Sequence, residues 1–254
     1  RGFYSGLLDF AGFIKPRGYF RQSLWADKPV AYLGTYALKG GGAANDVWSM
    51  LESEQGQQKN ETPSMDAWPI WNYQAGQIIR VVTYTNAAKA RLELNGKEVG
   101  QTKDYDQKNG IIYWDIPFAS GKLEVVGMDA SGKETVRHQL QSSKRPSAIK
   151  VLQSEEIQVK AMDGVAQIEL QLVDEDGIPV ATADDEITCE IVGNARLLGM
   201  EAGDNSDKSD YTDNKQRAFH GKMIIYIQAK DKTAGEITVR LSSPWLKPAI
   251  VKIK

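Results

Sequence analysis

Hydrophobic and polar residues alternate with a period of two along most of this chain. In residues 89–94, Ala90, Leu92 and Leu94 fall on one face, while Arg91 and Glu93 fall on the other. This is the pattern of a half-buried β-strand. The preceding stretch, 78–85, is rich in β-branched and aromatic residues, which suit a pleated strand. Asn95-Gly96 then supplies the two positive-φ residues of a type I′ hairpin turn, so the pattern predicts antiparallel β structure here.

The same period recurs before and after a polar, proline-containing stretch at residues 142–147. Before it, the alternating sets are Ile112, Trp114 and Ile116; Leu123 and Val125; Val136, His138 and Leu140. After it, they are Ala166, Ile168, Leu170 and Leu172; Ile187, Cys189 and Ile191; Met223, Ile225 and Ile227; Ile237, Val239 and Leu241. Short strands separated by turn residues are typical of β-sandwiches. The chain is therefore predicted to be mainly β, with two antiparallel sandwiches joined by a linker.

One stretch near the start has helical spacing instead. Phe20 and Leu24 lie four residues apart on one face, Pro16 suits a first helical position, and Pro29 forbids continuation past Lys28. The pattern predicts one amphipathic helix over residues 16–28. A helix this short is marginal without a packing partner, and we expect that partner to lie upstream in a longer polypeptide.

A long polar loop is predicted between the helix and the first sandwich. Residues 40–42 are three glycines, and residues 52–61 are almost entirely polar. A loop of this length without secondary structure is usually functional or disordered.

Composition adds few constraints. The net charge of −2 gives no electrostatic reason to expect nucleic acid or an anionic membrane as a partner. No apolar run approaches the roughly 20 residues of a membrane span. The single cysteine, Cys189, excludes an internal disulfide. The chain begins with Arg1 inside what reads as folded protein, so we expect a fragment of a longer polypeptide, periplasmic or secreted in a bacterium in preference to cytoplasmic.

Several motifs together resemble a known family. These are residues 84–86 (Tyr-Thr-Asn), 92–100 (Leu-Glu-Leu-Asn-Gly-Lys-Glu-Val-Gly), 6–13 with Lys15-Pro16, 173–180, 218–221 and 242–248. They are similar to the C-terminal region of bacterial glycoside hydrolase family 2 proteins of the β-galactosidase type. The resemblance implies that residues 1–37 are the end of a catalytic (β/α)₈ barrel, with its last helix. It further implies a first β-sandwich at 67–143 and an immunoglobulin-like sandwich at 144–254, and the chain departs from the family mainly in the polar loop at 38–66.

The resemblance also implies where the chemistry lies. Both catalytic glutamates of the family would precede Arg1, so no catalytic residue is expected in this chain. The parent enzyme would cleave a terminal β-linked sugar, galactose by preference. Tyr4 and Ser5 would follow the last barrel strand, on the face that carries active sites in barrels, and could touch the substrate. The Asn-x-Lys motif of related glucuronidases is not found at residues 2–5, so glucuronide specificity is not expected. The sandwiches would support the barrel, shape the active-site rim or form oligomer contacts.

Other polar candidates are interpreted as structural. Glu52, Glu54, Glu155 and Glu156 are expected to be solvated surface charges. His138 and His220 are expected to be hydrogen-bonded structural residues, and no zinc site can be assembled from two histidines and one cysteine. The acidic loop at 204–210 has oxygen ligands but lacks the glycine of a calcium loop, so no metal or cofactor is expected.

Four aromatic residues carry the rival interpretation. Trp68, Trp71 and Tyr73, with Trp48 in the polar loop, could stack on sugar rings as a carbohydrate platform. Large aromatic residues at this spacing are more often core or inter-domain packing. The rival functions are a stand-alone carbohydrate-binding or adhesion module and a purely structural spacer. The helix at 16–28 argues against the binding module, which has no use for a barrel remnant.

Overall fold

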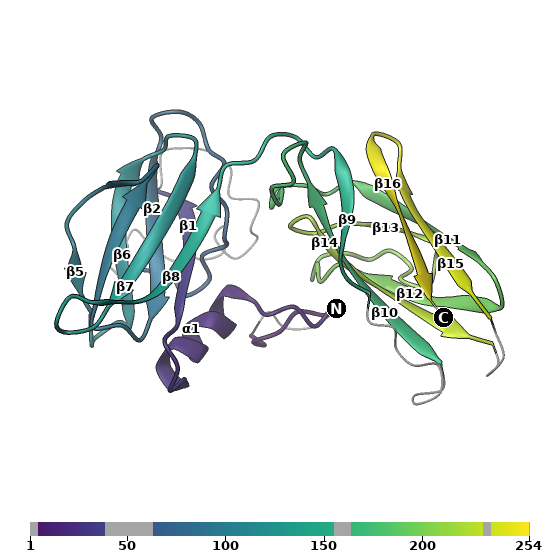
Figure 1. Ribbon diagram of the computed structural model, residues 1–254, viewed down its shortest axis with the longest axis horizontal. Helices are drawn as coiled ribbons and strands as arrows, with labels where there is room; N and C mark the ends of the chain where they lie inside the picture. Colours follow the sequence, from purple (N-terminus) through teal and green to yellow (C-terminus); the bar gives the residue numbers. More distant parts are fainter. Residues whose placement is uncertain (1–4, 39–62, 155–163, 231–234, 254) are drawn as a thin grey trace. The chain divides into compact units, whose positions relative to one another are not determined.

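The computed structural model describes residues 5–38, 63–154, 164–230 and 235–253 and divides the chain into two compact units (Figure 1). The N-terminal unit is Ile14–Ser142, and the C-terminal unit is Ser143–Lys254 together with Arg1–Phe13. Both are built mainly from β-strands, as predicted. No helix in the described ranges is long and apolar enough to cross a membrane.

The N-terminal unit consists of one helix and two sheets packed face to face. Its elements are α1 (Pro16–Trp25), β1 (Ala31–Ala37), β2 (Ile78–Thr85), β3 (Lys89–Leu94), β4 (Lys97–Glu98), β5 (Lys103–Asp104), β6 (Ile111–Pro117), β7 (Lys122–Met128) and β8 (Glu134–Gln141). One sheet has the order β1-β2-β6 and the other β4-β3-β7-β8, with β5 also pairing with β3. A single core lies between them, with Leu33 and Trp114 from the first sheet and Leu92 and Val125 from the second.

Strand β2 is buried on both faces, which explains its almost unbroken apolar sequence. Ile79 and Val81 face the core between the sheets, and Tyr84 faces the opposite side, where α1 packs. There the ring of Phe20 meets the ring of Tyr84 edge-on, with 5.5 Å between centroids. We expected the packing partner of this helix upstream; in the structure its buried face rests on β1 and β2 of the same unit.

The helix ends three residues earlier than the prolines allow. Trp25 is its last residue, because Ala26 has extended backbone angles. The side chain of Asn86 fixes this exit: its amide donates to the carbonyls of Ala26 (3.0 Å) and Lys28 (2.8 Å), and its oxygen accepts the N–H of Val30 (2.8 Å). Asn86 thus holds the chain between α1 and β1 in place.

The predicted hairpin at Asn95-Gly96 is confirmed. Both residues have positive φ, 53° and 76°, and Leu94 pairs with Lys97 across the turn. The Asn95 side chain also bridges the sheet, because its oxygen accepts the N–H of Lys122 (2.9 Å) and its amide donates to the carbonyl of Ser120 (3.0 Å).

The C-terminal unit is a single eight-stranded sheet that curves around one core. Its strands are β9 (Ala148–Ser154), β10 (Val165–Val173), β11 (Glu186–Val192), β12 (Ala195–Glu201), β13 (Lys215–Arg217), β14 (Lys222–Ala229), β15 (Ile237–Ser243) and β16 (Leu246–Ile253). Their order is β12-β14-β10-β9-β16-β15-β11-β13 (Figure 1). The buried core includes Leu170, Ile187, Met223 and Val239, which belong to the predicted inward-facing sets.

The strand pair that joins the two halves of this sheet, β12-β14-β10-β9 and β16-β15-β11-β13, is not antiparallel as expected for the sandwich. Strands β9 and β16 meet as a parallel pair, with Ala148 opposite Lys247. Because this pair joins the halves, the eight strands form one continuous, nearly closed sheet where two separate ones were expected.

Residues 5–13 lie against the C-terminal unit, whereas α1 and β1 belong to the N-terminal unit. The segment is a tight turn in which the carboxylate of Asp9 accepts the N–H groups of Ala11 and Phe13, both at 2.9 Å. Asp9 lies so close to Gly203 that a Cβ there would come within 2.4 Å of its carboxylate. The stretch 1–37, expected as one piece, is thus divided between the two units.

Candidate functional site

Trp71 is a core residue. Its side chain is 1% exposed, and its ring meets Phe118 edge-on with 5.0 Å between centroids. Its carbonyl accepts a hydrogen bond from the hydroxyl of Ser142 at 2.8 Å. A sugar platform requires an open ring face, so Trp71 cannot form one in this structure.

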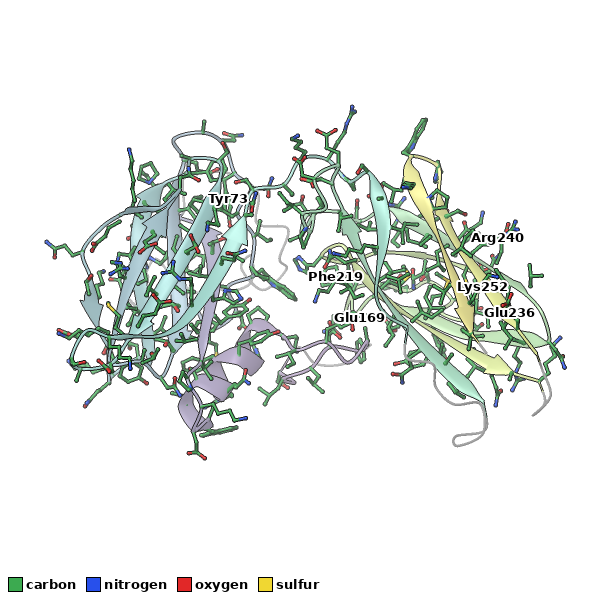
Figure 2. All side chains as sticks on the ribbon, in the orientation of Figure 1. Tyr73, Glu169, Phe219, Glu236, Arg240 and Lys252 are labelled. Atoms are coloured by element: carbon green, nitrogen blue, oxygen red, sulfur yellow. The ribbon has the colours of Figure 1, made fainter. Side chains whose placement is uncertain are left out.

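Tyr73 and Trp68 flank Trp71 on the same segment, which runs along β1. The hydroxyl groups of Tyr73 and Thr35 are 2.7 Å apart, and burial raises the pKa of Tyr73. Trp68 is half-buried, and its carbonyl accepts the N–H of Thr35 at 2.8 Å. Tyr73, labelled in Figure 2, packs near Trp71 and Phe118, with ring centroids 6.3 and 5.9 Å away, so Trp71 and Tyr73 are brought together as packing residues.

The remaining expected contact residues are placed differently. Ser5 is exposed at the start of the segment that lies on the C-terminal unit. Tyr4 and Trp48 fall outside the described residues, as do the carboxylates Glu52, Glu54, Glu155 and Glu156.

The densest set of charges among the described residues lies on the β3-β7-β8 face. Glu124, only 4% exposed, forms ion pairs with Lys122 (2.7 Å) and Arg137 (3.4 Å). Glu93 pairs with Arg91 (2.7 Å) and also with Arg137 (3.3 Å). Each of these two carboxylates therefore has two cationic partners.

The pKa values of carboxyl groups give no candidate for a general acid in the described ranges. Hydrogen bonding from Arg91 holds the pKa of Glu93 below its usual value. The other carboxyl groups with clearly displaced pKa values are also displaced downward: Asp106, Asp129, Glu134, Asp174 and Asp210. Glycoside hydrolysis requires one carboxylic acid with a raised pKa, so none of these six suits that role.

Both histidines are structural. His138 on β8 accepts the N–H of Leu33 at 3.2 Å through Nδ1, and burial lowers its pKa. His220 lies 3.2 Å from the carbonyl of Ala181 through Nδ1, and burial lowers its pKa to about 4. Both rings are therefore neutral near pH 7 and serve local packing.

The acidic loop at 204–213 satisfies its carboxylates internally. Asp204, Asp207 and Asp210 each accept the N–H and the hydroxyl of the residue two positions on: Ser206, Ser209 and Thr212. Within the described part of the chain, no three His, Cys, Asp or Glu side chains gather in a way that could hold a metal ion.

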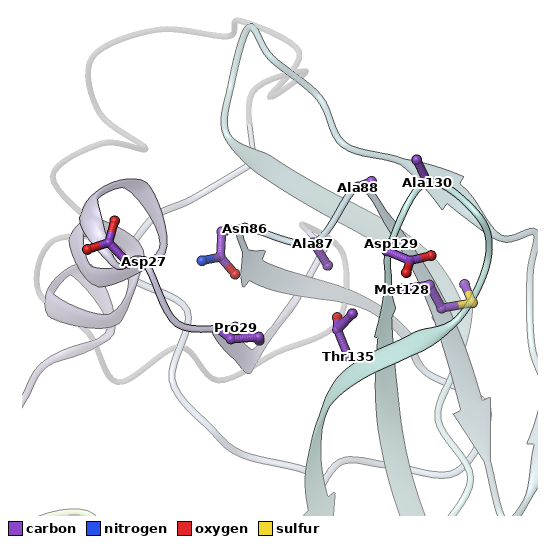
Figure 3. Close-up of a pocket in the computed structure, with 9 residues that line it drawn as sticks. All are labelled: Asp27, Pro29, Asn86, Ala87, Ala88, Met128, Asp129, Ala130 and Thr135. Carbon is purple, nitrogen blue, oxygen red and sulfur yellow. The ribbon is translucent and has the colours of Figure 1, made fainter.

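An open hollow of about 300 Å³ lies beside the exit from α1, between Pro29, Ala87 and Met128 (Figure 3). Its polar lining is mostly engaged in local structure. Asn86 forms the three bonds to the α1 exit, and the carboxylate of Asp129 accepts the N–H groups of Ser131 and Lys133. The two carboxyl residues of the lining are Asp27, just after the end of α1, and Asp129, whose carboxylate is held by the turn at 129–133.

One prominent residue was missed from the sequence. The side chain of Trp245 is 87% exposed at the turn between β15 and β16. The available signal was a Pro-Trp pair placed between two strands, where a turn normally carries small or polar residues.

Comparison with known proteins relates this chain to glycoside hydrolases. Residues 149–252 match the family described as glycoside hydrolase family 2 C-terminal domain 5, and residues 76–136 match a domain of unknown function. The whole chain is 26% identical to the β-galactosidase BoGH2A of Bacteroides ovatus, of which it spans 26%. Residues 149–252 thus carry a family 2 C-terminal domain, and the similarity over the whole chain supports a C-terminal region of glycoside hydrolase family 2.

Two further comparisons concern a curated relative and the fold. A protein of Formosa agariphila with a provisional assignment as a β-glucuronidase is 25% identical over 249 residues, which cover 94% of this chain and 20% of that protein. The crystal structure of a family 2 member from Bacteroides cellulosilyticus superimposes with a TM-score of 0.82 at 23% identity. It covers 99% of this chain and 32% of the solved one. The chain thus spans 26% and 20% of the lengths of these two curated relatives.

Proposed function

We propose that this chain is a non-catalytic C-terminal portion of a family 2 glycoside hydrolase that removes terminal β-linked galactose. The observation that carries the proposal is the match of all 254 residues to about a quarter of a β-galactosidase. The carboxyl groups support it, because those with displaced pKa values are all suited to remain ionised. The two glutamates that act as acid/base and nucleophile would lie in the remainder of the parent enzyme.

In this proposal both β units support the catalytic barrel, shape the rim of its active site or form oligomer contacts. Each is proposed to be an immunoglobulin-like sandwich, with residues 1–37 as the end of the barrel. The exposed apolar side chains of that stretch support a packing role: Leu8 and Phe10 are 54% and 47% exposed, and Trp25 is 71% exposed. Exposed apolar side chains of this kind suit interaction surfaces. Tyr4 and Ser5 are proposed to reach the substrate of the parent.

Galactose is proposed over glucuronic acid on two grounds. The relative that covers the whole chain is named a β-galactosidase, and the Asn-x-Lys motif of glucuronidases does not occur at residues 2–5. The stand-alone binding module becomes the weaker alternative, because Trp71 of its platform is buried.

Substrate choice is tested on the full reading frame that contains this segment. Its kcat/KM is measured with aryl β-D-galactoside and aryl β-D-glucuronide under identical conditions. We expect the galactoside to be preferred by at least about a hundredfold, since a site built for a hydroxymethyl group leaves a carboxylate without a partner. A preference for the glucuronide would overturn the assignment of galactose, and inactivity on every aryl β-glycoside would overturn the parent enzyme itself.

A further inference from the structure

The most exposed large hydrophobic side chain among the described residues is displayed on a rigid turn. Ser243 pairs with Leu246, which leaves Pro244 and Trp245 as a two-residue loop between β15 and β16. Proline fixes φ at the first turn position, so the loop has little freedom. Leu246, 6% exposed, anchors the turn in the core, and the N–H of Lys247 donates to the carbonyl of Ser147 at 2.7 Å.

The exposure of Trp245 is costly. An indole side chain carries about 150–250 Å² of surface, most of it apolar, and the hydrophobic effect favours its burial. Trp71 and Trp114 are 1% and 3% exposed, as that effect requires. A rigid turn that holds Trp245 at 87% exposure therefore presents a preformed flat surface to solvent.

The apolar surface at Trp245 is too small for a stable protein partner. A stable protein interface buries about 800 Å² on each side, several times what one indole offers. Farther from the turn, the hairpin is polar: Arg240 is exposed midway along β15, and at the open end Lys252 of β16 forms an ion pair with Glu236 at 3.0 Å (Figure 2). Ile250 is the one exposed large apolar side chain that the hairpin adds there. The apolar surface at the turn is thus limited to a single ring.

Charges near the base of the turn are balanced. Lys144, Arg145 and Lys247 provide three cations, and Asp174, Glu175 and Asp176 provide three carboxylates. Lys144 is itself bound by Glu175 and Asp176. This arrangement gives no net attraction for an anionic polymer.

We propose that Trp245 is a carbohydrate-binding residue that stacks on one pyranose ring of a neutral polysaccharide. A pyranose ring has a flat apolar face of C–H groups close to the area of one indole, and its C–H edges are attracted to the negative face of the π system. The proposal rests on the proposed function in one respect, that the parent enzyme acts on β-linked sugars. Trp245 would then hold a polymeric substrate near the enzyme.

The test is affinity electrophoresis of the 254-residue chain in gels that contain β-1,4-galactan, a mixed-linkage β-glucan or polygalacturonate. We expect at least one of the two neutral polymers to retard the chain. Trp245→Leu should weaken that retardation by about tenfold or more, and Trp245→Tyr should retain part of it because an aromatic face remains. The matched control is Trp25→Ala, which removes another exposed tryptophan and should leave retardation unchanged.

Four results would overturn the proposal: no retardation by either neutral polymer, retardation by polygalacturonate alone, undiminished retardation of Trp245→Leu, or equal weakening by Trp25→Ala. Sedimentation equilibrium provides a further arm, because a dimer that dissociates in Trp245→Leu would identify a second copy as the occupant. Circular dichroism should show the same fold for all variants, since the replaced side chains are exposed. Binding is measured without turnover, so its failure leaves the hydrolase assignment of the parent untouched.

Discussion

The pair His220-Gly221 shows how single residues fix the turns of the C-terminal unit. Both have positive φ, 51° and 69°, a conformation that glycine adopts freely and other residues rarely. A Cβ at Gly221 would come within 2.4 Å of the Val180 carbonyl, so only glycine fits at this position. His220 is held in its unusual conformation by Phe219, whose ring lies 4.2 Å away between centroids, and by the Ala181 carbonyl.

His220 makes the stability of its unit depend on pH. Its pKa is about 4 in the folded chain, against 6.5 for the unperturbed group. Above pH 6.5 both states are neutral and stability is at its full value. As pH falls from 6.5 to 4, the unfolded state takes up a proton and the free energy of unfolding decreases by at most about 3 kcal/mol. The decrease is smaller than this limit because solvent reaches the half-buried ring.

We therefore predict that His220→Asn loses less stability between pH 7 and pH 4.5 than the unmodified chain does. Asparagine tolerates positive φ, so the turn is retained. The measurement is urea unfolding at both pH values, followed by hydrogen exchange in β10 and β14. His138→Asn, in the other unit, is the control and should leave the pH response of β10 and β14 unchanged. Identical losses for His220→Asn and the unmodified chain would contradict the prediction.

At the scale of elements, strands with strong alternation were predictable and strands with weak contrast were not. β10 and β14 were identified because their inward residues alternate with polar ones. β12 could not be predicted from alternation, because Leu197 and Leu198 are adjacent apolar residues and a bulge interrupts its register before Gly199. β16 was obscured by Pro248 and by the exposed Ile250, which place apolar residues on both faces.

The motif at residues 84–86 carries part of the family resemblance, yet its packing role could not be predicted from the sequence. The hydroxyl of Tyr84 accepts the N–H of Ala67 (3.1 Å) and donates to the carbonyl of Ser64 (2.9 Å). Thr85 donates to the carbonyl of Val30 at 2.7 Å. These partners are 17 to 55 residues away in sequence, and no local pattern encodes such distant contacts.

Asn86→Ala should loosen the helix without unfolding its unit. It removes three hydrogen bonds to residues 26–30, and at a solvent-exposed site we expect a loss of about 1–2 kcal/mol. Hydrogen exchange of α1 should accelerate, while exchange in β7 stays near its original rate. Thr102→Ala is the control, because it deletes one exposed hydrogen bond, from the Thr102 hydroxyl to Glu98, elsewhere in the same unit. Equal exchange rates of α1 in the two variants would show that Asn86 does not hold the helix.

At the scale of the whole molecule, the family resemblance of the sequence is confirmed by the comparisons, and the mainly β character is confirmed by the structure. The candidate site residues were less predictable. Alternation places Trp71 and Tyr73 on one side, but it cannot say whether that side faces solvent, because both faces of an aromatic strand can be covered. The structure buries Trp71, which was a candidate for a sugar platform, and exposes Trp245, which was not.

The assay of the 254-residue chain alone on aryl β-D-galactoside tests the central claim most directly. We predict no turnover above the buffer rate at any pH between 4 and 8, because the two catalytic glutamates of the family are assigned to the rest of the parent enzyme. The full reading frame, assayed in parallel, is expected to hydrolyse the same substrate. Turnover by the isolated chain that is lost on replacing one of its own carboxyl residues would contradict the account.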